Sequence, residues 1–88
     1  MCRNIRVLHN FEPPTTPDEI RAAALQYVRK VSGLPKPPQA DLAAFDAAID
    51  AVTAATTALL ESLSSRGTVR TREGEREKAA RRWQMRRM

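Results

Sequence analysis

Cysteine and histidine are almost absent from this chain of 88 residues, which contains one of each, Cys2 and His9. A single cysteine cannot form a disulfide within the chain, so Cys2 fits a reducing compartment or a bond between chains. Structural zinc takes four ligands, and these two soft ligands would leave such a site incomplete. The composition therefore predicts no metal centre.

Glycine is also scarce, with three residues in all, and no glycine-rich motif occurs. Loops that cradle nucleotide phosphates need closely spaced glycines, because the backbone must approach the ligand. The sequence contains no calcium-loop pattern and no pair of metal ligands at a characteristic spacing. We therefore expect a protein without a cofactor.

Cys2 is the one residue that suggests catalysis. Removal of Met1 would expose an N-terminal cysteine, whose thiol lies beside an amine of low pKa, as in amine-assisted nucleophiles. Arg3 and Arg6 could favour the thiolate, and His9 could act as a base, but nothing in the spacing places His9 near Cys2. We interpret Cys2 as an incidental or packing thiol and expect no enzymatic activity.

Long apolar runs are missing as well. The opening MCRNIRVLHNF lacks the apolar core of a signal peptide, and no uninterrupted apolar run approaches the length that crosses a bilayer. The sequence therefore predicts a cytoplasmic protein with no membrane partner.

Basic residues are absent from residues 38–65, which carry four acids, whereas residues 66–88 hold nine of the fifteen basic residues and three acids. The segment charges are +1 for residues 1–16, +2 for 17–37, −4 for 38–65 and +6 for 66–88, within a net charge of +5. Attraction to nucleic acid or to an acidic surface would therefore come from the C-terminal segment.

A first helix is marked at both ends between residues 16 and 33. Thr16 is a suitable N-cap, Pro17 fits the first helical position, and Glu19 has the spacing of a capping box. Gly33 suits a left-handed C-cap. The expected apolar face consists of Ile20, Ala23, Ala24, Tyr27, Val28 and Val31.

A second helix is expected over about residues 39–64, after a proline-rich linker. Its flanking positions are mostly alanine, which allows close helix packing, but they lack the charge pairs that specify a long coiled coil. This favours a helical hairpin, which two copies could double into a four-helix dimer. Because so small a core gives marginal stability, we expect a homo-oligomer. The apolar stripe is Leu42, Phe45, Ile49, Val52, Thr56, Leu59 and Leu63.

The two ends of the chain complete the expected fold. Residues 1–11 resemble an extended arm, which must pair with another chain, lie across the helices or be irregular. The tail can form a helix from about Arg72, with Glu73–Arg76 and Glu77–Arg81 spaced for ion pairs. We predict an all-α helical hairpin with an extended N-terminal arm and a basic, partly helical C-terminal tail. The domains are residues 1–65 and the basic segment 66–88.

The tail is the candidate binding site. Its arginines can neutralise phosphates, and an interleaved tryptophan can stack on a base. The leading hypothesis is a non-enzymatic protein that binds RNA or a ribonucleoprotein. The alternatives are a solvated terminus, a tail that binds an acidic protein surface, or a homo-oligomeric or partner-binding helical adaptor with no nucleic-acid role. The candidate residues are Arg76, Lys78, Arg81, Arg82, Trp83, Arg86 and Arg87.

Four stretches of the chain resemble a family of small bacterial proteins of unknown function. They are the opening MCRNIRVL, the joint NFEPP, the helix EIRAAALQYVRKVSG and the segment AAFDAAIDAV. The resemblance covers about residues 1–63 and leaves the basic tail outside it. It implies an independent helical domain that includes the MCRNI opening, but it supplies no activity, ligand or catalytic residue.

Overall fold

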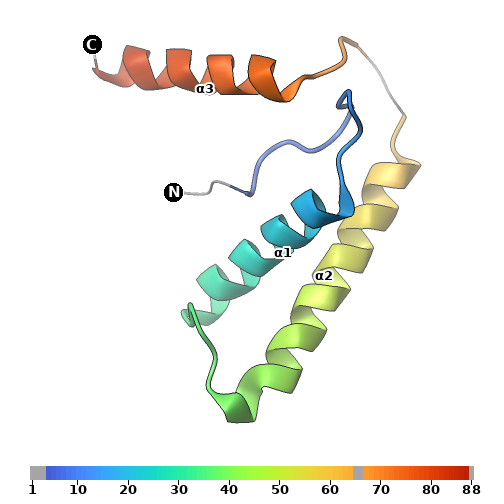
Figure 1. The fold of residues 1–88 in the computed structure, drawn as a ribbon, viewed down its shortest axis with the longest axis vertical. Helices are drawn as coiled ribbons and strands as arrows, with labels where there is room; N and C mark the ends of the chain where they lie inside the picture. Colours follow the sequence, from blue (N-terminus) through green and yellow to red (C-terminus); the bar gives the residue numbers. More distant parts are fainter. Residues whose placement is uncertain (1–3, 65–66, 88) are drawn as a thin grey trace.

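The computed structural model describes residues 4–64 and 67–87, and its elements are helical (Figure 1). The chain forms α1 (Pro17–Ser32), a 3₁₀ turn η1 (Gln39–Asp41), α2 (Leu42–Ser62) and α3 (Arg72–Arg87). Within the described residues no strand forms, and the pairing of extended backbone is limited to a parallel bridge between Phe11 and Arg70. The expected all-α class is confirmed.

Helix α1 begins and ends where its sequence signals predict. Glu19 donates its backbone N–H to Thr16 Oγ1 at 3.2 Å, and Thr16 donates its own N–H to Glu19 Oε1 at 2.8 Å. The capping box is therefore complete, and Pro17 occupies the first helical position. Gly33 ends the helix with φ of 71° and donates to the Arg29 carbonyl at 3.0 Å.

The core of the hairpin lies between α1 and the first half of α2. It is a cluster of four buried side chains, around which Leu25, Leu34, Ala48 and Val52 pack. Burial of a side chain as large as phenylalanine or isoleucine contributes about 1.5–3 kcal/mol. At the edge of the core, Arg21 of α1 pairs with Asp50 of α2 at 2.7 Å. The four buried residues are Ala24, Val28, Phe45 and Ile49.

The apolar stripe of α2 is only half covered, which the sequence did not indicate. Phe45 and Ile49 are buried, but Leu59 is 55% exposed and Leu63 is 45% exposed. Helix α2 has 21 residues against 16 in α1, so its last turns extend past the start of α1 (Figure 1). On α1, Tyr27 is likewise exposed, although it belongs to the expected apolar face.

The N-terminal arm is irregular and lies across α1. Asn4 and Ile5 donate their backbone N–H groups to the side-chain oxygen of Gln26, at 2.8 and 3.1 Å. Further along the arm, Leu8 and Phe11 are buried. The arm combines two of the arrangements that the sequence left open, because it is irregular and lies across a helix. Cys2 lies outside the described residues.

Helix α3 stands apart from the hairpin (Figure 1). Thr71 caps its start, because Thr71 Oγ1 accepts the N–H of Gly74 at 3.0 Å. Apart from side-chain contacts of its first residue, α3 does not pack against α1 or α2 in the described part of the chain. Within α3 the observed ion pair joins Lys78 to Glu75 at 3.2 Å, and the expected pairs Glu73–Arg76 and Glu77–Arg81 do not form.

The segment Gln39–Ser62 is long and apolar enough to cross a membrane by length and composition, contrary to the expectation from apolar runs. Its many alanines raise the mean hydropathy of its most apolar 18-residue window to 1.4, although aspartates interrupt the apolar stretches. Because the core helix of a soluble protein passes the same test, this property does not establish a membrane span.

Candidate nucleic-acid interface

The segment that leads into α3 is hydrogen-bonded to the N-terminal arm. Arg70 donates its backbone N–H to the Asn10 carbonyl at 2.8 Å, and the Arg70 carbonyl accepts the N–H of Glu12 at 2.9 Å. The Arg70 side chain donates to the His9 carbonyl at 2.9 Å. These bonds fix where the chain enters α3.

Arg72, the first residue of α3, adds a second attachment. Its Nε and Nη2 donate to the two carboxylate oxygens of Glu19, at 2.9 and 2.7 Å. It also donates to the carbonyls of Pro13 and Pro14, at 2.9 and 3.1 Å. Its guanidinium lies 5.4 Å from the centre of the Phe11 ring. A planar fork with several donors suits this role better than a lysine would.

Glu19 is the most strongly perturbed titratable group that the structure resolves. The hydrogen bonds from Arg72, and then the backbone N–H of Thr16, lower the pKa of Glu19 from 4.5 to about 2, against a smaller opposing effect of burial. The same pair raises the pKa of Arg72. Arg6 approaches the Glu19 carboxylate at 3.4 Å from the arm. Glu19 therefore stays ionised and keeps α3 attached at neutral pH.

Between residues 5–7 of the arm and α3 lies a cavity of about 710 Å³, which we call the arginine groove. The arm contributes two apolar side chains and one arginine, and α3 contributes three arginines, one glutamate and one alanine. The lining is positively charged, because four arginines face one carboxylate. The residues are Ile5, Arg6, Val7, Arg72, Glu75, Arg76, Ala79 and Arg82.

The structure divides the tail residues predicted from the sequence. Arg76 and Arg82 line the arginine groove, whereas Arg81 lies on the opposite side of α3 by helical periodicity. Lys78 is exposed and paired with Glu75. The same periodicity places Trp83 and Arg86, both exposed, on the groove side of α3, beyond the last lining residue. The side chain of Arg87 lies outside the described part of the chain.

Two arginines in the groove were not among the binding residues predicted from the sequence. Arg6 is on the arm, and Arg72 precedes the basic cluster and is committed to Glu19 and to backbone carbonyls. No local pattern marks either residue, because their partners are distant in the sequence. The contacts appear only when the arm and α3 are brought together.

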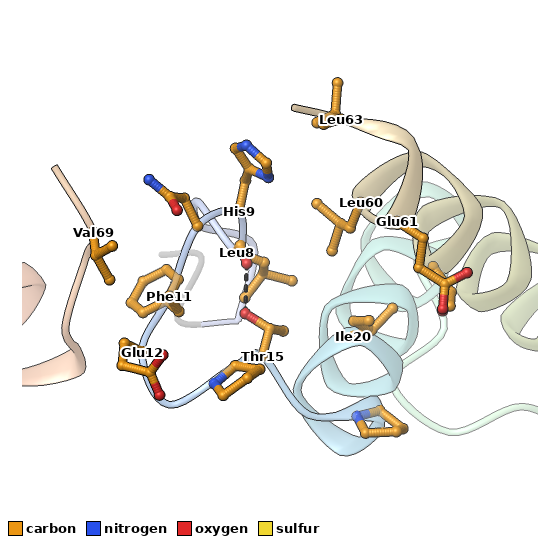
Figure 2. A pocket seen from close by; sticks show the side chains of 14 residues that line it. Leu8, His9, Phe11, Glu12, Thr15, Ile20, Leu60, Glu61, Leu63 and Val69 are labelled. Atoms are coloured by element: carbon orange, nitrogen blue, oxygen red, sulfur yellow. Dashed lines mark hydrogen bonds between the residues drawn. The ribbon is translucent and has the colours of Figure 1, made fainter. Parts of the chain in front are cut away.

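A second cavity, of about 680 Å³, lies between the arm, the start of α1 and the end of α2 (Figure 2). Leu8, Ile20 and Leu60 form its apolar walls, and Glu61 lies at the α2 side. His9 Nε2 donates to the Ser64 carbonyl at 3.1 Å, so the histidine is held by backbone rather than by a catalytic partner. Among the described residues that line this cavity, no nucleophile is hydrogen-bonded to a base.

Among the described residues, no group of three or more histidine, cysteine, aspartate or glutamate side chains could hold a metal ion.

Comparison with curated proteins finds no match, and comparison with solved structures finds none either. The model of an uncharacterised conserved protein family, DUF2277, matches residues 1–78. The match passes residue 63, where the sequence resemblance stops, and takes in Arg70, Arg72 and the first half of α3. This chain therefore belongs to the uncharacterised conserved family DUF2277.

Proposed function

We propose that the protein is a non-enzymatic binding protein that engages RNA or a ribonucleoprotein through α3. One observation carries the proposal: the helix stands off the hairpin and exposes Arg76, Lys78, Arg81, Arg82 and Arg86 together. Phosphate contacts from lysine and arginine supply most of the sequence-independent affinity for nucleic acid. Trp83, which is 58% exposed, is a candidate for stacking on a base.

The charge order within α3 has a competing structural explanation. Acids fall early in the helix, at Glu73, Glu75 and Glu77, and all charged residues of the later turns are basic. Acids near the N-terminus and cations near the C-terminus complement the helix dipole, so this order also stabilises a solvated helix. The displacement of α3 from the hairpin favours binding, because a helix needed only for stability would gain more by packing.

Salt dependence of RNA binding tests the proposal. Anisotropy of a labelled single-stranded RNA is titrated with the intact chain at two salt concentrations. Three phosphate contacts would already weaken the affinity about 20-fold between about 50 and about 200 mM salt. Absent binding, or binding that does not respond to salt, would overturn the proposal.

A second candidate function is a homo-oligomeric or partner-binding helical adaptor, in which the tail is solvated or lies on an acidic surface. Exposed leucines on the apolar stripe of α2 and at its C-cap favour it: Leu42, Leu59 and Leu63. Cytoplasmic localisation and self-association belong to both proposals. A chain that binds no RNA but sediments as an oligomer would support the adaptor.

A further inference from the structure

We infer that the arginine groove binds single-stranded RNA. The phosphates would lie on the α3 side and the ribose or bases on the arm side. The inference rests on the proposed function and adds three points to it. They are where the RNA binds, that the RNA is single-stranded, and which arginines contact it. The duplex form of RNA and acidic polypeptides are the competing ligands.

Two of the four groove arginines are available for a ligand. Arg72 is committed to Glu19 and to two carbonyls, and Arg6 lies 3.4 Å from the Glu19 carboxylate. In the described part of the chain, Arg76 and Arg82 form no ion pair. They are six positions apart in one helix, so they can meet successive phosphates of a strand that runs along α3.

The carboxylate in the groove does not cancel the positive charge of Arg76 and Arg82. Glu75, the one carboxylate in the lining, pairs with Lys78 at 3.2 Å. That contact draws the carboxylate toward a cation of its own helix. An incoming phosphate therefore meets a lining that is positive on balance.

The arm supplies the opposite wall, which is apolar. Ile5 is 42% exposed and Val7 is 49% exposed, and both line the groove. A duplex directs its phosphates and sugars outward and keeps its bases stacked inside, so it would leave these side chains in water. The unstacked bases and ribose of a single strand can cover them.

The groove is held open by contacts that a ligand does not have to create. The bonds of Arg70 to the arm and of Arg72 to Glu19 fix the start of α3, and Gln26 holds the arm at Asn4 and Ile5. A preformed site spends less binding free energy on ordering. Its volume of about 710 Å³ lies within the range of pre-formed ligand sites.

Adjacent arginines provide the matched test. Arg82→Gln and Arg81→Gln each remove one charge from neighbouring positions of α3, and glutamine keeps the helix propensity. In the intact chain, Arg82→Gln should weaken single-stranded RNA binding about tenfold, as expected for a lost charge-assisted hydrogen bond. Arg81→Gln should weaken it no more than about twofold, since it changes only the general field. Circular dichroism checks that both variants remain helical.

The ligand arms of the experiment are a single strand, a hairpin duplex of equal length and a polyglutamate of equal charge. The inference expects the single strand to bind most tightly. Equal losses of RNA affinity in the two variants, or tighter binding of the duplex, would overturn the inference that RNA binds in the groove. Either result would leave the proposed function standing. Tighter binding of polyglutamate would replace RNA with an acidic protein, and no RNA binding by the unaltered chain would remove both proposals.

Discussion

Arg72 connects parts of the chain that the sequence does not mark as neighbours. It reaches the carboxylate of Glu19 in α1 and the carbonyls of Pro13 and Pro14, and it lies over Phe11. Glu19 in turn completes the capping box with Thr16. One carboxylate therefore both starts α1 and attaches α3, so its charge state affects two elements.

The pKa of Glu19 predicts how stability changes with pH. A carboxyl whose folded pKa lies near 2 and whose ordinary value is 4.5 stabilises the fold fully above pH 4.5 and loses that contribution as the pH falls toward 2. We expect Glu19→Gln to be less stable than the unaltered chain at neutral pH and to lose less stability across that acid range. Urea unfolding followed by circular dichroism, repeated across the range, measures both.

The control for Glu19→Gln is Thr16→Ala. Glutamine can still accept the N–H of Thr16, so Glu19→Gln removes charge but keeps the capping box. Thr16→Ala removes the hydroxyl that accepts the Glu19 N–H and should cost about 1 kcal/mol without flattening the acid response. Identical pH profiles for Glu19→Gln and the unaltered chain would contradict the assigned role of the Arg72–Glu19 pair.

At this scale, sequence reasoning succeeded where the signal is local. Thr16, Glu19 and Gly33 were identified correctly, because caps depend on residues within one turn. Arg72 was expected only to begin a helix, since its partner Glu19 is 53 positions away and carbonyl acceptors leave no trace in a sequence. The arginine groove was missed for the same reason.

At the scale of the element, α2 combines a regular apolar stripe with uneven burial. The segment Gln39–Ser62 has a most apolar window with a mean hydropathy of 1.4, and 11% of that window is buried. Heptad spacing indicates which side chains share a face, but it does not say how much of that face a shorter partner helix can cover. The exposure of Leu59 and Leu63 therefore required the structure.

Two substitutions on this stripe distinguish packing within the chain from coverage of the stripe by another chain. Ile49→Ala should lower the free energy of unfolding by about 2–5 kcal/mol, because it leaves a cavity in the hairpin core. Leu59→Ala should change it by no more than about 0.5 kcal/mol if Leu59 faces water. Chemical unfolding measures both, and Ile49→Val, at about 1 kcal/mol, substitutes if Ile49→Ala does not fold. A large loss from Leu59→Ala would show that another chain covers the end of α2.

At the scale of the whole molecule, the chain is extended, because α3 stands apart from the packed helices α1 and α2. The radius of gyration is 15.4 Å and the extents are 44 × 36 × 16 Å. A compact domain of this length would have a radius of gyration of about 12 Å. The third dimension is little more than one helix thick, so the chain offers two broad faces and a small interior.

Small-angle scattering with an in-line mass measurement tests this shape. A monomer should give a radius of gyration near 15.4 Å and the mass of one chain, 9.8 kDa. A doubled mass would favour the homo-oligomer. If Leu59→Ser then had the mass of one chain while the surface control Arg29→Ser kept the doubled mass, the contact between chains would lie on α2. A monomer with a radius near 12 Å would mean that α3 folds back onto the hairpin in solution.

The long reach of the Arg72–Glu19 contact also has a consequence for the order of folding. Arg21 and Asp50, which pair within the hairpin, are 29 positions apart, against 53 for Glu19 and Arg72. Closing a longer loop costs more chain entropy, so the hairpin is expected to form first and the attachment of α3 later. The same attachment should open first in the native state, by local unfolding that spares the hairpin. A strand bound in the groove would suppress that opening and protect the amides of residues 70 and 12 from hydrogen exchange.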